Sequence, residues 1–170
     1  MLKCRSNQDA GTFLNISVKS FLQFIESTLQ EIPRKYYHGS DTLLSVGTTL
    51  KPTPDYEQNW SHSKFYRVLE HYRPATMLAH KDSVFMVGDV DDIELSGGRT
   101  DHIFVVQPLG KVERHDSNWS TEISLAIQDG IVPDDPEVAI MADNYWSGKP
   151  YHEAVWEYLT PSAKILSVKT

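Results

Sequence analysis

Apolar residues recur every three or four positions along residues 17–32, which is the spacing of one face of an amphipathic helix. These positions are Val18, Phe21, Leu22, Ile25, Leu29 and Ile32. Ser17 is suited to cap the start of the helix, and Pro33 ends it because proline cannot continue the hydrogen-bond ladder. The polar stretch 1–16 has no such period and predicts an extended lead-in.

The helical period returns in the segments 60–72, 118–127 and 136–145, and a brief helix is predicted at 89–95. Pro74 stops the first of these helices. Short apolar runs between the helices predict strands. The runs lie at 35–38, within 40–50, and at 83–87, 102–109, 154–159 and 164–168, and the more polar segment 111–115 is also expected to be a strand.

Strands interleaved with helices predict an α+β fold. We expect one domain over residues 1–170, with its core at 35–168. Within that core, the run from Ile103 to Val106 is continuously apolar, which is typical of a central strand buried on both faces.

The composition is that of a globular domain without a membrane span or an internal disulfide. No apolar run in the 170 residues nears the roughly 20 residues that cross a bilayer. With one cysteine and no apolar leader, we expect a soluble cytoplasmic protein. The net charge of −7, without a basic cluster, argues against a tightly bound nucleic acid.

Motifs for several common chemistries are missing from the sequence. The seven histidines have no spacing typical of a zinc site, so we expect no metal. The chain also lacks a Gly-x-Ser-x-Gly elbow, a Walker-type loop and a Gly-x-Gly-x-x-Gly fingerprint. Hydrolase, P-loop and Rossmann functions therefore lose their usual signals.

Two polar groups lie at strand positions far apart in the chain. His38 and Gly39 follow the aromatic pair Tyr36-Tyr37, where a strand ends and the backbone can turn or let a ligand approach. Glu157 lies within the apolar run 155–159. Each has an ordinary interpretation, as a surface histidine before a turn and as a solvated glutamate on an edge strand. If His38 and Glu157 instead face one cleft, both could contribute to a binding or catalytic site.

Four stretches around these residues follow one another in a characteristic order. They are Tyr37-His38-Gly39-Ser40, Ser83 to Val87, Ile103 to Gly110, and Glu157 to Pro161 followed by Lys164 to Val168. In order and character they resemble the ADP-ribosyltransferase superfamily, and they are similar to its compact bacterial or phage members related to rifampin ADP-ribosyltransferase. The resemblance implies a split β core of two short packed sheets flanked by helices, with NAD as co-substrate.

The resemblance also implies roles for single residues. His38 would hydrogen-bond a ribose hydroxyl of NAD, and the Gly39 backbone, with Ser40 beside it, would bind the nicotinamide carboxamide. Phe85 falls where members with this histidine usually have a tyrosine that stacks on the nicotinamide ring, so the ring is kept and the hydroxyl is missing. Glu157 falls at the catalytic glutamate, which favours loss of nicotinamide.

Elementary chemistry supports parts of this assignment independently. Breaking a ribose N-glycosidic bond develops positive charge on the sugar, and a fixed carboxylate such as Glu157 stabilises it. Tyr36, Phe85 or Trp146 could hold the flat cationic ring by stacking, although core packing also explains such aromatic residues. Arg73 could donate to a phosphate, or it is an ordinary arginine at a helix end.

The predicted function is therefore NAD-dependent transfer of ADP-ribose, a glycosyltransferase reaction, to an unidentified acceptor with release of nicotinamide. Val155 stands where arginine-specific enzymes of this superfamily often carry a second acidic residue, which makes arginine a doubtful acceptor. The alternatives are a non-catalytic module that binds NAD or a partner, an NAD hydrolase, and an activity like that of an RNA 2′-phosphotransferase.

Overall fold

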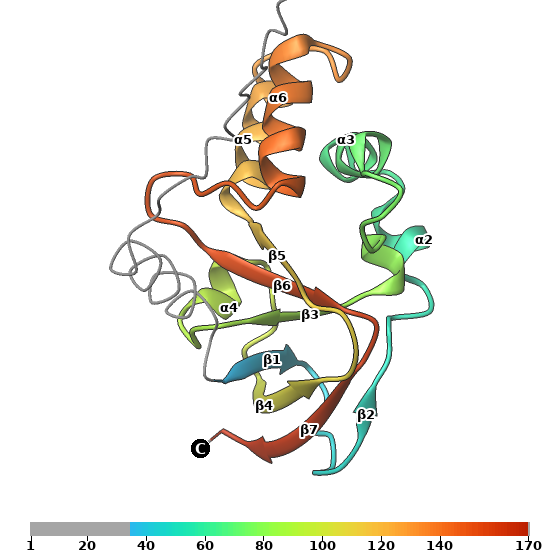
Figure 1. Ribbon diagram of the computed structural model, residues 1–170, viewed down its shortest axis with the longest axis vertical. Helices are drawn as coiled ribbons and strands as arrows, with labels where there is room; N and C mark the ends of the chain where they lie inside the picture. The colour runs from blue at the N-terminus through green and yellow to red at the C-terminus, as the bar shows by residue number, and fades with distance from the viewer. Residues whose placement is uncertain (1–34, 170) are drawn as a thin grey trace, which may run out of the picture. The chain divides into compact units, whose positions relative to one another are not determined.

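The computed structural model describes residues 35–169, all of which belong to one compact unit of the chain (Figure 1). The predicted lead-in at 1–16 and the predicted helix at 17–32 lie outside the described residues. Within the described part, strands and helices are mixed, which confirms the prediction of an α+β fold.

Seven strands of the described chain form one sheet, in which every neighbouring pair is antiparallel. The strands are β1 (Tyr36–Ser40), β2 (Thr49–Leu50), β3 (Val84–Val87), β4 (His102–Pro108), β5 (Glu113–Asp116), β6 (Trp156–Thr160) and β7 (Ala163–Val168). Their order across the sheet is β2-β7-β4-β1-β3-β6-β5. The apolar run predicted as a central strand is β4, between β7 and β1.

The pairing between β1 and β3 is the shortest in the sheet. These strands share a single register pair, Tyr37 with Val87, whereas β1 pairs with β4 through five residue pairs and β3 with β6 through four. The expected two separate packed sheets are therefore wrong as stated, because this pair joins both parts into one sheet. The weak junction still leaves most of β1 without a strand neighbour on the β3 side.

The helices form largely where the apolar period predicts them. They are α2 (Tyr56–Trp60), α3 (Lys64–Tyr72), α4 (Asp92–Leu95), α5 (Asn118–Gln128) and α6 (Pro136–Trp146), with a 3₁₀ turn η1 at His80–Asp82. Asp135 caps α6 by accepting a hydrogen bond from the Glu137 backbone N–H, and Pro136 occupies its first turn. The segment predicted as one helix at 60–72 is interrupted at residues 61–63, so that α2 and α3 are separate.

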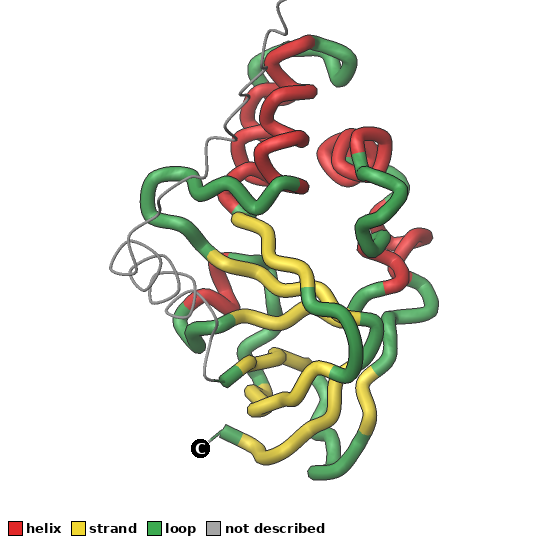
Figure 2. The backbone as a smooth tube through the Cα atoms, in the orientation of Figure 1, coloured by secondary structure: helices red, strands yellow, loops and turns green. Residues whose placement is uncertain are grey.

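Two apolar clusters hold these elements together. One lies on the sheet and contains Leu50, Val84, Met86, Phe104, Val106, Tyr158, Ala163 and Ile165. The other joins α3, α5 and α6 and contains Val68, Leu69, Ile123, Val138, Ala142, Tyr145 and Trp146. Figures 1 and 2 show α5 and α6 side by side with α3 across from them, at one end of the sheet.

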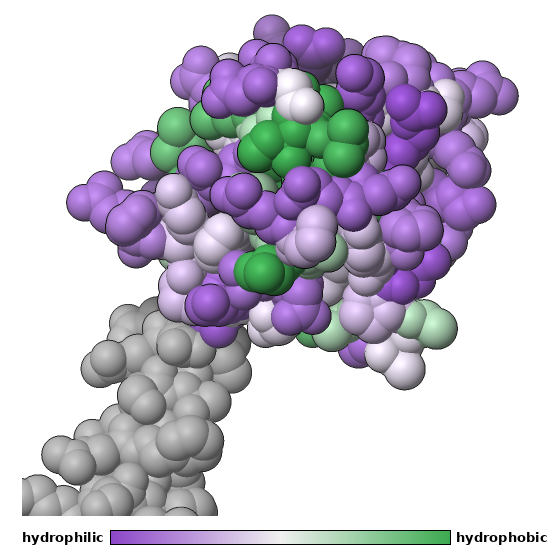
Figure 3. Space-filling view, turned by 90° about the horizontal axis from the view of Figure 1, so that it is seen from above, coloured by the Kyte–Doolittle hydropathy of each residue, from purple (hydrophilic) through white to green (hydrophobic). Residues whose placement is uncertain are grey.

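The surface over this helical end is mostly polar, with small apolar patches between the polar side chains (Figure 3). Among the described residues, no helix has the length and apolar character that a membrane crossing requires.

Candidate functional site

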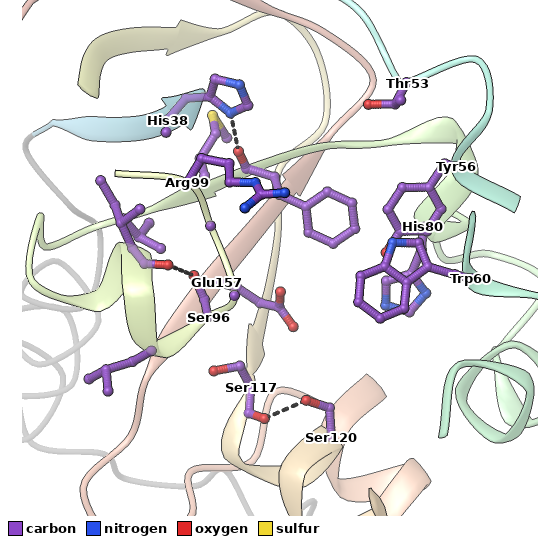
Figure 4. A pocket seen from close by; sticks show the side chains of 18 of the residues that line it. His38, Thr53, Tyr56, Trp60, His80, Ser96, Arg99, Ser117, Ser120 and Glu157 are labelled. Atoms are coloured by element: carbon purple, nitrogen blue, oxygen red, sulfur yellow. Dashed lines mark hydrogen bonds between the residues drawn. The ribbon is translucent and has the colours of Figure 1, made fainter. Parts of the chain in front are cut away.

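A pocket of about 510 Å³ opens where β1 and β3 diverge (Figure 4). Its lining comes from strands β1, β3 and β6, from the segment 93–99, from α2, α3 and α6, from η1, and from the start of α5. The structure brings four of the residues singled out in the sequence into this lining: His38, Gly39, Phe85 and Glu157. They come from three strands that are far apart in the chain, so only the folded sheet places them together.

His38 is held in one tautomer by the neighbouring strand. Its Nδ1 lies 2.8 Å from the carbonyl oxygen of Phe85, so Nδ1 carries the proton and donates it. Burial lowers the pKa of His38, and the bond to Phe85 opposes this only in part. The imidazole is therefore neutral near pH 7. Its Nε2 makes no hydrogen bond to another described residue and can accept one from a hydroxyl group.

Gly39 is required by a close backbone approach. A Cβ atom at this position would lie 1.8 Å from the carbonyl oxygen of Arg99 and 2.9 Å from the Ile93 side chain. The segment 97–99 can therefore pack against β1 only because residue 39 has no side chain. This contact sets Arg99 at the pocket, and Figure 4 shows its guanidinium pointing inward.

Glu157 is a buried carboxyl group in the pocket wall. Its residue is 7% exposed, and its Oε1 accepts a 2.8 Å hydrogen bond from the Tyr145 hydroxyl. Burial raises the pKa of Glu157, although the charge of His80 and the Tyr145 bond oppose the rise. The interpretation of Glu157 as a solvated edge residue is therefore wrong, because β3 and β5 flank β6 on either side.

The Phe85 ring lies within an aromatic stack. Tyr56 is nearly parallel to it, with ring centroids 5.5 Å apart, and His80 is nearly parallel at 5.8 Å. Burial and the charge of Glu157 raise the pKa of Tyr56, so its hydroxyl keeps its proton. The pocket thus contains tyrosine hydroxyls, from Tyr56 and Tyr145, although Phe85 has none.

Other residues predicted at the site lie outside the pocket lining. The Tyr36 ring packs edge-on against Tyr158 on the sheet, with centroids 5.1 Å apart. Ser40 accepts a hydrogen bond from the Thr42 backbone N–H within the turn after β1. Trp146 is buried in the helical cluster and donates from Nε1 to the Leu69 carbonyl oxygen.

Arg73 is also away from the pocket lining. Its Nε donates to Glu70 at 2.9 Å, and its Nη1 donates to the Met77 carbonyl oxygen at 2.7 Å. The guanidinium therefore fastens the end of α3 and the chain that follows. The prediction that Arg73 contacts a phosphate of NAD is therefore not supported for this pocket.

Sequence reasoning missed several residues of the lining. They are Tyr56, His80, Arg99, Tyr145 and the hydroxyl residues Ser117, Ser120 and Thr121. Arg99 is the one arginine or lysine among the described residues that line the pocket. The pair Gly97-Gly98 before Arg99 is a signal that could have drawn attention to this segment, because adjacent glycines end a helix and let the chain turn. His80 and Tyr145 carried no local signal, because their function depends on partners far away in the sequence.

Comparison with known proteins does not identify the chain, since neither a family model nor a curated protein matches the sequence. Within residues 35–169, no group of three or more His, Cys, Asp or Glu side chains is arranged to hold a metal ion.

Proposed function

We propose that this protein binds NAD in the pocket and transfers its ADP-ribose to an acceptor, with release of nicotinamide. The observation that carries the proposal is the convergence of His38, Phe85 and Glu157, each from a different strand, on one pocket. The order of the three residues in the chain resembles that of the ADP-ribosyltransferase superfamily, and their chemistry suits the bond to be broken.

Glu157 would act on the nicotinamide ribose. A buried carboxylate is costly without a positive partner, and the nicotinamide ring of NAD and the sugar cation that follows both supply positive charge. A fixed charge that is shielded from water lowers the barrier more than it would in solution, and Glu157 is buried. The acceptor then attacks the sugar carbon as neutral nicotinamide leaves, and the acceptor loses a proton.

The remaining side chains would orient NAD. The unprotonated Nε2 of His38 can accept a hydrogen bond from a ribose hydroxyl, and Arg99 offers a guanidinium for the phosphates. The aromatic residues Tyr56 and Phe85 would hold the nicotinamide ring. Because Tyr56 and Phe85 already stack on one another, the ring would enter beside them or displace Tyr56.

The experiment is to incubate the protein with NAD and measure nicotinamide release, alone and with a lysate that supplies acceptors. Glu157→Gln keeps the shape of the side chain and removes the charge, and we expect a loss of about 100-fold or more in turnover. Glu153→Gln is the matched control, because that glutamate is exposed and outside the pocket lining. Equal turnover in both variants would overturn the proposal.

The second candidate function is NAD binding without catalysis. It is favoured by the missing hydroxyl of Phe85 and by the ring of Tyr56 stacked on it. In that case NAD raises the unfolding temperature of the wild type, while no nicotinamide is released under any condition. Nicotinamide release without label on any acceptor would instead identify NAD hydrolysis. A labelled RNA 2′-phosphate substrate tests the remaining alternative, which the net charge of −7 disfavours.

A further inference from the structure

Four side chains form a continuous hydrogen-bonded chain that ends at the pocket. Glu70 on α3 contacts Nδ1 of His80 at 2.5 Å, Nε2 of His80 contacts the Tyr145 hydroxyl at 2.8 Å, and that hydroxyl donates to Glu157 at 2.8 Å. His80, Tyr145 and Glu157 are all less than 10% exposed. Water therefore has little access to the protons within the chain.

The number of protons in the chain follows from the geometry. Three hydrogen bonds need three protons, and a carboxylate cannot donate any. When Tyr145 donates to a charged Glu157, its oxygen must accept from Nε2 of His80, and Nδ1 must donate to Glu70. His80 is then doubly protonated.

A second arrangement holds the same number of protons. If Glu157 is protonated, it donates to the Tyr145 oxygen, Tyr145 donates to Nε2 of His80, and His80 keeps only its proton on Nδ1. The two arrangements differ by two short transfers. The Glu157 proton moves to the Tyr145 oxygen, and the Tyr145 proton moves to Nε2, so no proton enters or leaves the chain.

Glu70 remains a carboxylate in both arrangements. Burial alone would raise its pKa, but the hydrogen bonds from the ring and the backbone N–H of His80, and the bond from Arg73, lower the pKa to about 2. Glu70 thus faces His80 with a fixed negative charge. The two arrangements therefore differ in whether His80 or Glu157 carries the additional proton.

Burial favours the neutral form of Glu157, whereas the proposed reaction needs the carboxylate. We propose that Glu70, His80 and Tyr145 form a proton relay that withdraws the proton from Glu157 and keeps it on His80 while positive charge occupies the pocket. This inference rests on the proposed function for its purpose, but the relay itself can be measured without NAD. In these terms His80, Tyr145 and Glu70 are positioning residues that act through Glu157.

Other groups facing the relay do not interrupt it. They are Tyr56, Tyr66, Arg73, His115 and Asp116. The Tyr66 ring contacts His80 edge-on, with centroids 6.0 Å apart, and no hydrogen bond joins its hydroxyl to the chain. Tyr66→Phe therefore changes a neighbouring hydroxyl without touching the proton path, and serves as the matched control.

The first test is the pH dependence of NAD turnover from pH 5 to 9. With the relay, Glu157 loses its proton internally, so the wild-type rate stays nearly constant across this range. In His80→Gln, Tyr145→Phe and Glu70→Gln, Glu157 must lose its proton to solvent. Below its raised pKa, the rate should then fall about tenfold for each unit of decreasing pH.

A purely structural role predicts a different result. The three variants would then lose the same factor at every pH, with a profile of wild-type shape, and this would overturn the relay. Tyr66→Phe should keep the wild-type profile. Glu70→Gln is the variant least affected by misfolding, because the Glu70 side chain is 21% exposed and its replacement leaves no buried cavity. It therefore still tests the relay if the other two variants fail to fold.

The second test uses the protein without NAD. The ring nitrogen signals of ¹⁵N-labelled His80 should shift when Glu157 is replaced by Gln, because the Tyr145 hydroxyl connects the two side chains through hydrogen bonds. The same replacement in a Tyr145→Phe background should leave them unchanged. An unchanged His80 spectrum in Glu157→Gln would overturn the relay, whether or not NAD is a substrate. Failure of the wild type to consume or bind NAD would overturn the proposed function alone.

Discussion

The backbone carbonyl of Arg99 lies where the side chain of any other residue at position 39 would be, 1.8 Å from an ideal Cβ on Gly39. This relationship links β1, which carries His38, to the segment that brings a cationic side chain to the pocket. One missing side chain therefore controls two parts of the proposed NAD site.

Gly39→Ala should disturb both parts at once. The added methyl group must push the backbone of segment 97–99 away, at a cost of about 1–3 kcal/mol in the free energy of unfolding. Binding of NAD should weaken more than stability alone explains, because Arg99 moves with its backbone. Chemical unfolding and NAD titration measure the two effects. Ser40→Ala adds no atom on the same strand and lies outside the pocket lining, so it should leave NAD affinity unchanged and cost no more than the exposed hydrogen bond from the Thr42 backbone N–H. An unaltered NAD affinity in Gly39→Ala would contradict the prediction.

Arg99→Gln should weaken NAD binding by about tenfold or more. A hydrogen bond between a guanidinium and a phosphate contributes about 1.5–3 kcal/mol, and the described lining offers no other lysine or arginine to replace it. The value of KM should rise while kcat changes less, since the phosphates are remote from the reacting bond. Arg67→Gln, an exposed residue of α3 outside this pocket, is the control. A normal KM in Arg99→Gln would place the phosphates elsewhere.

Acid should destabilise the fold through His115. This imidazole is 1% exposed, its Nδ1–H donates to the Tyr145 carbonyl oxygen, and its Nε2 has no hydrogen-bond partner. Burial lowers its pKa to about 4, whereas the unfolded chain protonates near the ordinary value of about 6.5. Between these values the unfolded state binds the extra proton, so stability falls as pH decreases from about 6.5 to 4.

The expected loss over that interval is about 3 kcal/mol, at roughly 1.4 kcal/mol per pH unit. Urea unfolding at a series of pH values measures it. The carboxyl group of Glu113 lies 3.8 Å from Nε2 and favours the imidazolium, so it already limits how far burial lowers the pKa of His115. In His115→Gln the decrease over this interval should be much smaller, and an equal decrease would assign the acid sensitivity to other groups.

Asp116→Asn should lower stability by about 1.5–3 kcal/mol. The buried carboxylate of Asp116 accepts hydrogen bonds from the backbone N–H groups of Asn118, Tyr151 and Val155, and thereby ties the segment before β6 to the start of α5. An amide in its place turns one acceptor into a donor that faces another donor. Thermal unfolding checks the result against Asp129→Asn, an exposed aspartate for which we expect little change.

Much of the secondary structure of the described chain could be read from local patterns. The apolar period together with Asp135 and Pro136 predicts α6, and the continuous apolar run 103–106 predicts β4, because each pattern reflects which face of an element is buried. The interruption at residues 61–63 was not predicted, although these residues are all polar and Trp60 and Phe65 are five positions apart. Separate sheets were expected, and a single pair between Tyr37 and Val87 joined them.

The candidate site divides in a similar way. His38, Gly39, Phe85 and Glu157 could be chosen from strand ends, an unusual residue type in an apolar run, and a family resemblance. Only the tertiary structure shows that Arg99, and not Arg73, lines the pocket. It also shows that Glu70, His80 and Tyr145 form a hydrogen-bonded chain that ends at Glu157. Local sequence sets which faces of helices and strands are apolar. Which polar groups meet depends on strand register and helix packing, which join segments as far apart in the sequence as Val84 and Thr160 and leave no periodic trace in the chain.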